Sequence, residues 1–134
     1  MADVIDASVA IKWFIEEPGR DNALVVLKKF VHNPNFYAVP ELFFFELTNI
    51  FNRLISKPTS VQIELLEYVL LSGVHRFAMT PELSRLQRKY QHLGLSGYDA
   101  SYVAVAELLH GKWITFDEKA SKKIKNTKLI ELLD

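Results

Sequence analysis

The fold of this chain is decided by the stretch LSGYDASYVAVA, residues 95–106, in which a glycine-marked turn leads into an apolar helix. One carboxylate, Asp99, lies in the first turn of that helix. Ser96 followed three residues later by an acid has the form of a capping box, and the helix dipole favours an acid at this end. Taken alone, Asp99 is an ordinary helix cap, so a functional role depends on where the other acids lie.

Predicted strands and helices alternate along the rest of the sequence. Short apolar or β-branched runs predict strands at residues 4–5, 36–39, 74–79, 112–116 and 129–130. Helical spacing and end signals predict helices at residues 8–15, 21–31, 40–56, 59–72, 80–93, 96–110 and 118–123. This alternation predicts an α/β fold with a mostly parallel sheet between two helical layers, a three-layer α/β/α sandwich.

Several helix ends carry recognisable signals. Pro40 occupies a predicted first helical position, and Thr59 with Gln62 forms a second capping-box pattern. Thr80 followed by Pro81 predicts a further helix start, and Gly111 predicts the stop of the helix that begins near Ser96. In an open sheet of this class, ligands bind beyond the carboxyl ends of the strands, where the strand order switches.

Length and composition limit the classes of protein that the sequence can encode. A chain of 134 residues, 49% of them hydrophobic, predicts one globular domain over residues 1–134. The formal net charge of zero means that nucleic-acid binding would need a local basic patch. No cysteine is present, which excludes disulfides and thiolate sites, and no signal peptide or membrane span is recognisable. We therefore expect a cytoplasmic protein with no membrane contact.

The predicted helix at residues 40–56 carries a carboxylate within an apolar run. Leucine, isoleucine and phenylalanine surround its axis, so we expect this helix to be buried on most sides. Glu46 lies inside the run and must be paired, protonated or bound to a cation. An ion pair with Arg53 or Lys12 and a functional role are equally good interpretations of this helix alone.

Four acids are predicted to meet at one edge of the sheet. Asp6 and Asp117 each follow a strand directly, while Glu46 and Asp99 lie near the starts of helices. Caps and ion pairs would explain each acid separately. Together they would repel one another unless protons or a divalent cation neutralised them, and oxygen ligands suit Mg²⁺ or Mn²⁺. Such a cation supports phosphoryl chemistry, and no competing catalytic motif is present.

The chain resembles the PIN domain family, specifically the single-domain VapC-type toxins of prokaryotic toxin–antitoxin pairs. The resemblance covers essentially the whole chain, and its motifs occur in the family's order. They are Val4-Ile5-Asp6-Ala7-Ser8, Val39-Pro40-Glu41-Leu42 leading to Glu46-Leu47-Thr48-Asn49, Tyr98-Asp99-Ala100, and Thr115-Phe116-Asp117. The family fold is a three-layer sandwich around a parallel sheet, in agreement with the prediction from the strand and helix pattern.

The resemblance implies a Mg²⁺- or Mn²⁺-dependent endoribonuclease. By position, Asp6, Glu46, Asp99 and Asp117 would be the catalytic and metal-binding acids, with Glu118 as the alternative to Asp117. Ser8, Asn49 and Thr115 would orient the acids or the substrate. The basic residues that would contact RNA are Lys12 and Arg53 near the site and Lys119, Lys122 and Lys123 after Asp117. The resemblance also implies a VapB-type antitoxin and a homodimer.

Two other functions remain open on the sequence. The same fold and acids would serve a housekeeping nuclease that processes RNA or acts on DNA. Alternatively, the chain is a non-catalytic binding module in which the acids are structural caps and pairs. Neutralising the acids would then destabilise the protein, whereas in a metal site it would remove repulsion and abolish metal binding.

Overall fold

The computed structural model describes residues 1–134 and contains one five-stranded sheet in which every strand pair is parallel. The strand order is β3-β2-β1-β4-β5. The strands are β1 (Asp3–Ile5), β2 (Tyr37–Pro40), β3 (His75–Phe77), β4 (Trp113–Thr115) and β5 (Ile130–Leu132). Val4 of the central strand pairs with Ala38 on one side and Trp113 on the other. The chain moves one way from β1 to β3 and the other way from β4 to β5, so β1 and β4 flank the switch in strand order.

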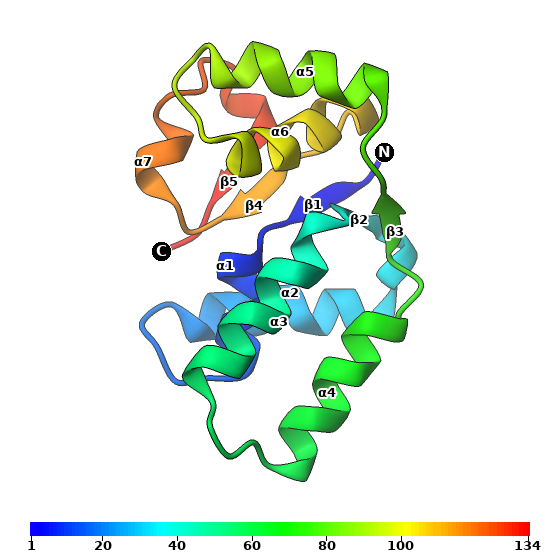
Figure 1. Cartoon of the computed structure of the whole chain (residues 1–134). Helices are drawn as coiled ribbons and strands as arrows, with labels where there is room; N and C mark the ends of the chain where they lie inside the picture. The colour runs from blue at the N-terminus through cyan, green and yellow to red at the C-terminus, as the bar shows by residue number, and fades with distance from the viewer.

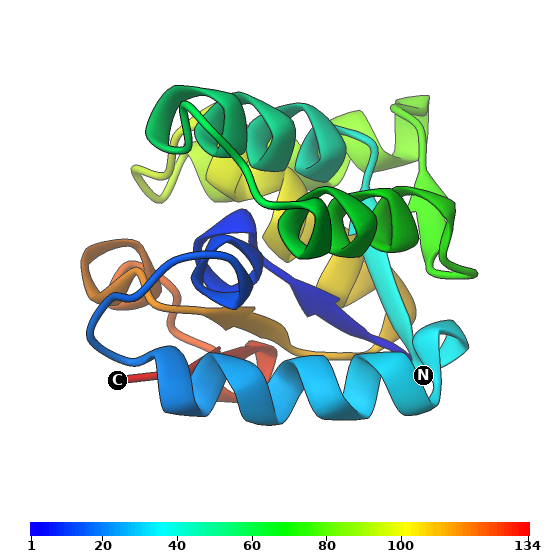
Figure 2. The same cartoon turned by 90° about the horizontal axis from the view of Figure 1, so that it is seen from below.

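Helices cover both faces of this sheet. They are α1 (Ala7–Ala10), α2 (Arg20–His32), α3 (Leu42–Leu54), α4 (Ser60–Leu71), α5 (Pro81–Gln91), α6 (Gly97–Leu109) and α7 (Glu118–Ser121), with 3-10 turns η1 (Ile11–Trp13), η2 (Pro34–Phe36) and η3 (Thr127–Leu129). Figure 1 shows α5, α6 and α7 on one side of the sheet and α1 to α4 on the other. Seen from below, α1 lies between α2 and α3 (Figure 2). The predicted three-layer α/β/α sandwich is confirmed.

The helix that begins after Ser96 is the most deeply buried helix of the fold. Residues 100–106 of α6 are all buried, and the helix packs against β1, β2 and β4. Small residues and β-branched valines in this stretch allow the helix to approach the sheet closely on several sides. Because Asp99 stands at its first turn, this packing fixes the height of the acid above the sheet.

The start and burial of α3 differ from the sequence prediction. Pro40 is the last residue of β2 and pairs with Phe77, so α3 begins at Leu42 rather than at the proline. A proline without an N–H is tolerated at the end of a strand, and its fixed φ also suits an extended chain. The helix buries one face only, since the side chains of Phe45 and Leu54 are 70% and 51% exposed. The expectation of burial on most sides was wrong.

The predicted caps of α4 and α5 are confirmed. The Thr59 hydroxyl accepts a hydrogen bond from the backbone N–H of Gln62 at 3.1 Å, and the Gln62 side chain accepts one from the Thr59 N–H at 2.9 Å. Thr80 accepts a hydrogen bond from the Leu83 N–H at 3.1 Å in the same way. These bonds satisfy N–H groups that the helices themselves leave free.

The end of α6 depends on both His110 and Gly111, whereas the sequence predicted only Gly111 as the helix stop. His110, not Gly111, takes the left-handed conformation, with φ of 56°. Gly111 is needed for a different reason, because a Cβ atom there would lie 1.7 Å from the carbonyl oxygen of Ala2. The glycine therefore lets the turn before β4 pass directly against the start of β1.

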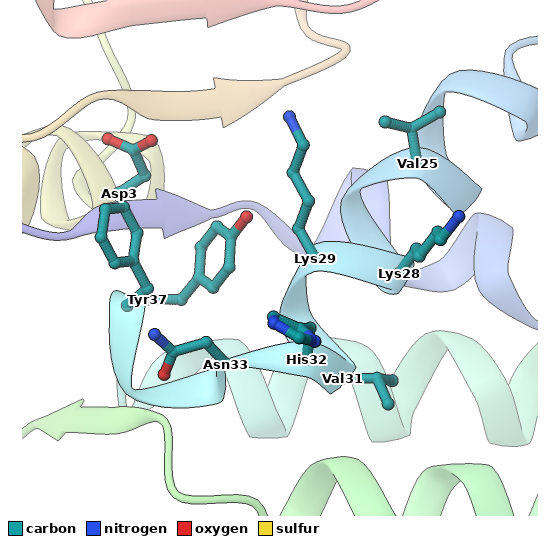
Figure 3. A pocket seen from close by; sticks show the side chains of 9 residues that line it. Asp3, Val25, Lys28, Lys29, Val31, His32, Asn33 and Tyr37 are labelled. Carbon is teal, nitrogen blue, oxygen red and sulfur yellow. The ribbon is translucent and has the colours of Figure 1, made fainter.

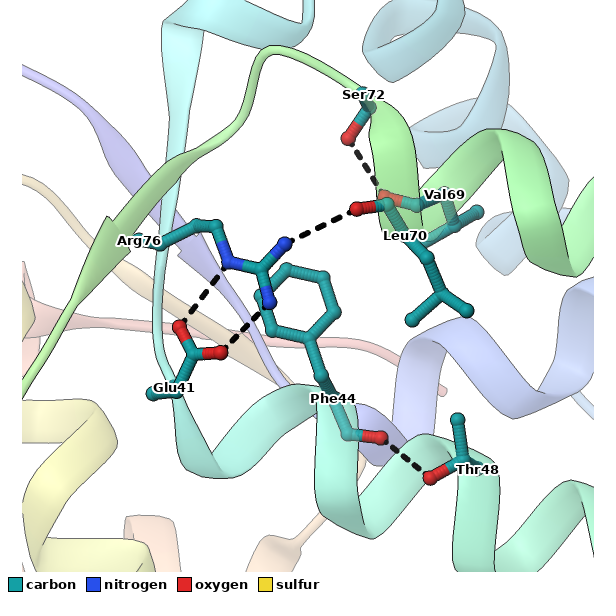
Figure 4. A network of polar contacts seen from close by, with 7 residues as sticks. All are labelled: Glu41, Phe44, Thr48, Val69, Leu70, Ser72 and Arg76. Atoms are coloured by element: carbon teal, nitrogen blue, oxygen red, sulfur yellow. Dashed lines mark hydrogen bonds and ion pairs between the residues drawn. The ribbon is translucent and has the colours of Figure 1, made fainter.

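An arginine on the edge strand joins three elements on one side of the sheet. The Arg76 guanidinium makes two hydrogen bonds to the Glu41 carboxylate, at 2.6 and 3.1 Å, and donates a third to the Leu70 carbonyl at 3.0 Å. It also lies 3.8 Å from the centre of the Phe44 ring (Figure 4). β3, the end of α4 and the start of α3 are thereby held together, although β3 is shorter than its predicted range.

No helix of the structure combines the length and the apolar character needed to cross a membrane.

Candidate active site

Asp6 is the most deeply buried acid of the predicted set. It follows β1 at the N-cap position of α1, yet it makes no capping hydrogen bond and is 7% exposed. Instead, its Oδ2 accepts hydrogen bonds from the hydroxyls of Ser8 at 2.6 Å and Thr115 at 2.8 Å. Burial raises the pKa of Asp6 from 3.8 to about 6, the two hydroxyls oppose this rise, and the charges of Glu46 and Asp99 add to it. The structure thus brings Ser8 and Thr115 to Asp6.

Glu46 has a tyrosine partner rather than a basic one. Neither Arg53 nor Lys12 forms an ion pair with it, and the Lys12 ammonium lies 3.2 Å from Glu17 instead. The Tyr102 hydroxyl donates a hydrogen bond to Glu46 Oε1 at 2.6 Å. Burial raises the pKa of Glu46, the bond from Tyr102 lowers it, and the charge of Asp99 raises it. The ion-pair interpretation of Glu46 is therefore not supported.

Asp99 caps its helix only through the neighbouring serine. The Ser96 hydroxyl accepts a hydrogen bond from the Asp99 N–H at 3.1 Å, but no bond returns from the Ser96 N–H to the Asp99 carboxylate. Burial is the main cause that raises the pKa of Asp99, and the charge of Asp117 adds to it. Ser96 and Lys123 act in the opposite direction. The capping box predicted for α6 is only half formed, which leaves the carboxylate of Asp99 available.

Asp117 links the end of β4 to α7. Its Oδ1 accepts a hydrogen bond from the Ala120 N–H at 2.8 Å, and its own N–H donates to Thr115 Oγ1 at 3.0 Å. Thr115 therefore contacts both Asp6 and Asp117. The neighbouring Glu118 is exposed and pairs with Lys122 at 2.9 Å. Of the two alternatives for the fourth acid, the geometry favours Asp117.

The four acids form one electrostatically coupled group at the carboxyl edge of β1 and β4. The charges of Glu46 and Asp99 raise the pKa of Asp6, and the charge of Asp99 raises the pKa of Glu46. The charge of Asp117 in turn raises the pKa of Asp99. None of them takes part in an ion pair. Uncompensated carboxylates of this kind attract a hard divalent cation. In the side-chain positions of this structure, however, no three His, Cys, Asp or Glu residues form a group that could hold a metal ion.

The donor set nevertheless fits such a cation. All four side chains offer carboxylate oxygens, which Mg²⁺ and Mn²⁺ prefer. Asp6 is fixed by two hydroxyls and Glu46 by one, whereas the Ser96 hydroxyl beside Asp99 accepts from the Asp99 backbone N–H. The carboxylates of Asp6, Glu46 and Asp117 are thus held by hydrogen bonds.

The remaining predicted residues lie at different distances from this group. Asn49 is exposed on α3, one turn beyond Glu46, and Lys119 is exposed on α7. Lys12 is engaged with Glu17 and lies 4.7 Å from the centre of the Phe116 ring. Lys123, not Lys119, is the basic residue that acts on the acids, because its charge lowers the pKa of Asp99.

Sequence reasoning missed Tyr102. The residue lies three positions after Asp99, so on a helix the two side chains occupy the same face. That spacing was the available signal, but it does not reveal that α3 passes close enough for the hydroxyl to reach Glu46. Tyr102 is fully buried, and burial together with the charges of Asp6 and Glu46 raises its pKa well above the usual value.

A large hollow of the molecule lies elsewhere. Its volume is about 760 Å³, and it lies between the C-terminal half of α2 and the amino ends of β1 and β2 (Figure 3). Asp3 and Tyr37 begin those two strands, whereas Asp6 follows the opposite end of β1. The acids and this hollow are therefore on opposite edges of the sheet.

Known proteins that resemble the chain agree with this architecture. The family model described as the PIN domain matches residues 4–126. No curated protein sequence matches the chain significantly.

Among solved structures, a toxin–antitoxin complex from Klebsiella pneumoniae contains a chain with a TM-score of 0.68 and 16% identity, covering 97% of this chain and 96% of that one. VapBC2 from Rickettsia felis, bound to a DNA fragment from its promoter, has a TM-score of 0.67 and 16% identity, with complete coverage of both chains. A protein from Pyrobaculum aerophilum has a TM-score of 0.66 and 22% identity, covering 97% and 83%. At these identities the similarity establishes a shared fold.

Proposed function

Because the chain belongs to the PIN domain family, we propose that it is a Mg²⁺- or Mn²⁺-dependent endoribonuclease and the toxin of a toxin–antitoxin pair. The observation that supports this most strongly is the coupled group of acids without any ion pair. Asp6, Glu46 and Asp99 all have a raised pKa, and for each of them the charge of another member contributes. Perturbed acids at a switch in strand order are typical of a functional site.

The four acids together form the proposed cation site. Asp6, Glu46, Asp99 and Asp117 would hold the cation, with Asp6 as the fixed member because two hydroxyls hold one of its oxygens. A divalent cation bound there would polarise a phosphate oxygen and make a bound water more acidic. Asp99 would adjust its side chain to the ion, since its carboxylate lacks a fixed partner.

Lys123 is the proposed contact for the RNA backbone. Its Nζ donates a hydrogen bond to the Gly94 carbonyl at 3.0 Å, in the turn that precedes α6 and Asp99. The side chain is exposed and within electrostatic range of the acids. A lysine beside an acidic site offsets the repulsion between its carboxylates and phosphate groups. Lys12 is less available because Glu17 pairs with it.

Exposed apolar side chains support the proposed protein partners. Phe45 and Leu54 on α3 and Val61 and Leu71 on α4 are between 51% and 86% exposed. Large apolar side chains in such numbers on neighbouring helices commonly mark a protein interface. We expect a homodimer and a VapB-type antitoxin to use this surface, and light scattering at high concentration would return a monomer mass if no dimer forms.

The first experiment is a thermal melt of the protein in EDTA and then in millimolar Mn²⁺. The proposal expects a rise in Tm with Mn²⁺ that is lost in Asp99→Asn, because a ligand that binds the native state stabilises it. Asp21→Asn is the matched control, since Asp21 also lies in the first turn of a long helix but is not among the charges that raise the pKa of Asp6, Glu46 or Asp99. It should keep the full Mn²⁺ response.

Cleavage assays would then separate the nuclease classes. Single-stranded RNA and DNA of the same sequence are incubated with the protein in Mn²⁺ and in EDTA. The proposal expects RNA to be cut only with Mn²⁺, and not by Asp99→Asn. Cleavage of DNA alone would indicate the DNA-directed alternative. The absence of a Mn²⁺ response together with destabilisation by Asp99→Asn would indicate a binding module.

A further inference from the structure

Tyr102 connects the elements that carry the acids. It is fully buried on α6, and its hydroxyl reaches across to α3, where it donates to Glu46 Oε1 at 2.6 Å. Its ring stacks on Trp113 of β4, with centroids 6.3 Å apart and planes inclined by 20°. Trp113 lies two positions before Thr115, whose hydroxyl holds Asp6. One side chain thus contacts α3 and β4 from the helix that carries Asp99 in its first turn.

The contact holds Glu46 at one oxygen only. No hydrogen bond is made to Glu46 Oε2, and no basic residue lies in ion-pair contact with this carboxylate. An arginine or lysine in the place of Tyr102 would also orient Glu46, but it would cancel the charge that attracts a cation. A neutral phenol orients the carboxylate and leaves its charge in place.

Resting on the proposed function, we propose that Tyr102 is a positioning residue of the acid site, which holds Glu46 Oε1 so that the second oxygen is presented to a bound divalent cation. Tyr102 does not itself contact the cation. It acts through Glu46, in the way that outer hydrogen-bond partners of metal ligands commonly set ligand orientation.

The alternative is that the bond only braces α6 against α3, and the chain contains a matched control for it. Tyr90 on α5 is 2% exposed, and its hydroxyl donates to Glu107 Oε1 on α6, also at 2.6 Å. This second tyrosine–glutamate bond likewise joins two helices, but it lies away from the acids. Tyr102→Phe and Tyr90→Phe therefore remove the same hydroxyl from the same kind of bond.

The test compares Mn²⁺ binding by the wild-type chain and both variants, using calorimetric titration and the Mn²⁺-dependent shift in Tm. Both variants are expected to lose a few °C of Tm in EDTA, because each removes a hydrogen bond that joins two helices. Glu107 keeps its bond from Lys89 Nζ at 2.7 Å, whereas Glu46 is left without a hydroxyl donor. Tyr102→Phe should weaken Mn²⁺ binding by about 10-fold or more, the effect typical of a lost outer partner. Tyr90→Phe should leave the Kd for Mn²⁺ within about 2-fold of wild type.

A double-mutant cycle tests whether Tyr102 acts through Glu46. Glu46→Gln keeps an oxygen that can accept from Tyr102 but lacks the charge, so it should weaken Mn²⁺ binding by itself. Adding Tyr102→Phe to Glu46→Gln should then produce no further loss of Mn²⁺ affinity. An additional loss of the same size as in the single variant would show that Tyr102 does not act through this glutamate.

Two further results would overturn the inference, and they are distinguishable. If Tyr102→Phe loses stability as Tyr90→Phe does and binds Mn²⁺ as tightly as wild type, the bond is only a brace. The proposed function would then still stand. If the wild-type chain itself shows no Mn²⁺ binding, the proposed metal site fails and the role of Tyr102 fails with it.

Discussion

Replacing Asp6 by asparagine should stabilise the metal-free protein at neutral pH. Burial raises the pKa of this carboxyl from 3.8 to about 6. Between these two pH values the folded state therefore keeps a proton that the unfolded state has already released. Stability therefore falls as pH rises from about 4 to above 6, and the full difference corresponds to roughly 3 kcal/mol. The neutral amide of Asp6→Asn avoids this loss while its oxygen still accepts hydrogen bonds from Ser8 and Thr115.

The assay is urea or thermal unfolding between pH 4.5 and 8 in EDTA. At pH 7.5 we expect Asp6→Asn to gain up to about 3 kcal/mol, a rise in Tm of up to roughly 10 °C. Its stability should depend less on pH than that of wild type, with a residual slope from Glu46 and Asp99, whose pKa values are also raised. Asp21→Asn controls for the loss of one negative charge. A variant less stable than wild type at pH 7.5, or a wild type whose stability does not change with pH, would refute this reasoning.

Three further predictions concern the turn after α6 and the lysine near the acids. Gly111→Ala should destabilise the fold by more than about 4 kcal/mol, measured by urea unfolding, since its Cβ would lie 1.7 Å from the Ala2 carbonyl oxygen. His110→Gly should raise the free energy of unfolding by about 1 kcal/mol because φ is 56° at this position. A decrease would contradict the strain assigned to it. Lys123→Gln should weaken RNA binding and lower the slope of log K against log salt by about 0.7, whereas Lys28→Gln, on the opposite edge of the sheet, should leave the slope unchanged.

Local patterns in the sequence predicted the fold well. The apolar run after Asp99 became the buried helix α6, and the Thr59 and Thr80 caps start α4 and α5 as predicted. These features depend on neighbours within one or two turns of chain, which a sequence displays directly. The alternation of strands and helices predicted the parallel sheet. Because Asp6 directly follows the first strand, its position at the carboxyl edge of that sheet could be predicted as well.

Contacts between distant segments could not be predicted in the same way. Gly111 resembles a helix stop in sequence, but its closest constraint is the carbonyl of Ala2. The partner of Glu46 is Tyr102, 56 positions away, and no local rule favours this tyrosine over Arg53 or Lys12 as the partner. Pro40 ends a strand because β3 pairs with it, although its sequence context suits a helix start equally well.

The hydrogen bond between Thr115 and Asp6 spans 109 positions, which sets the order in which the acid site can form during synthesis. At about 5–20 residues per second, a ribosome needs roughly 5–20 s to pass from one residue to the other. Throughout that interval β1 lacks its β4 neighbour, and Asp6 lacks one of the two hydroxyls that hold it. Asp6, Glu46 and Asp99 are all made before Thr115, so a growing chain carries three of the four acids before Thr115 can bond to Asp6. Assembly of the site therefore waits until Thr115 and Asp117 have been made.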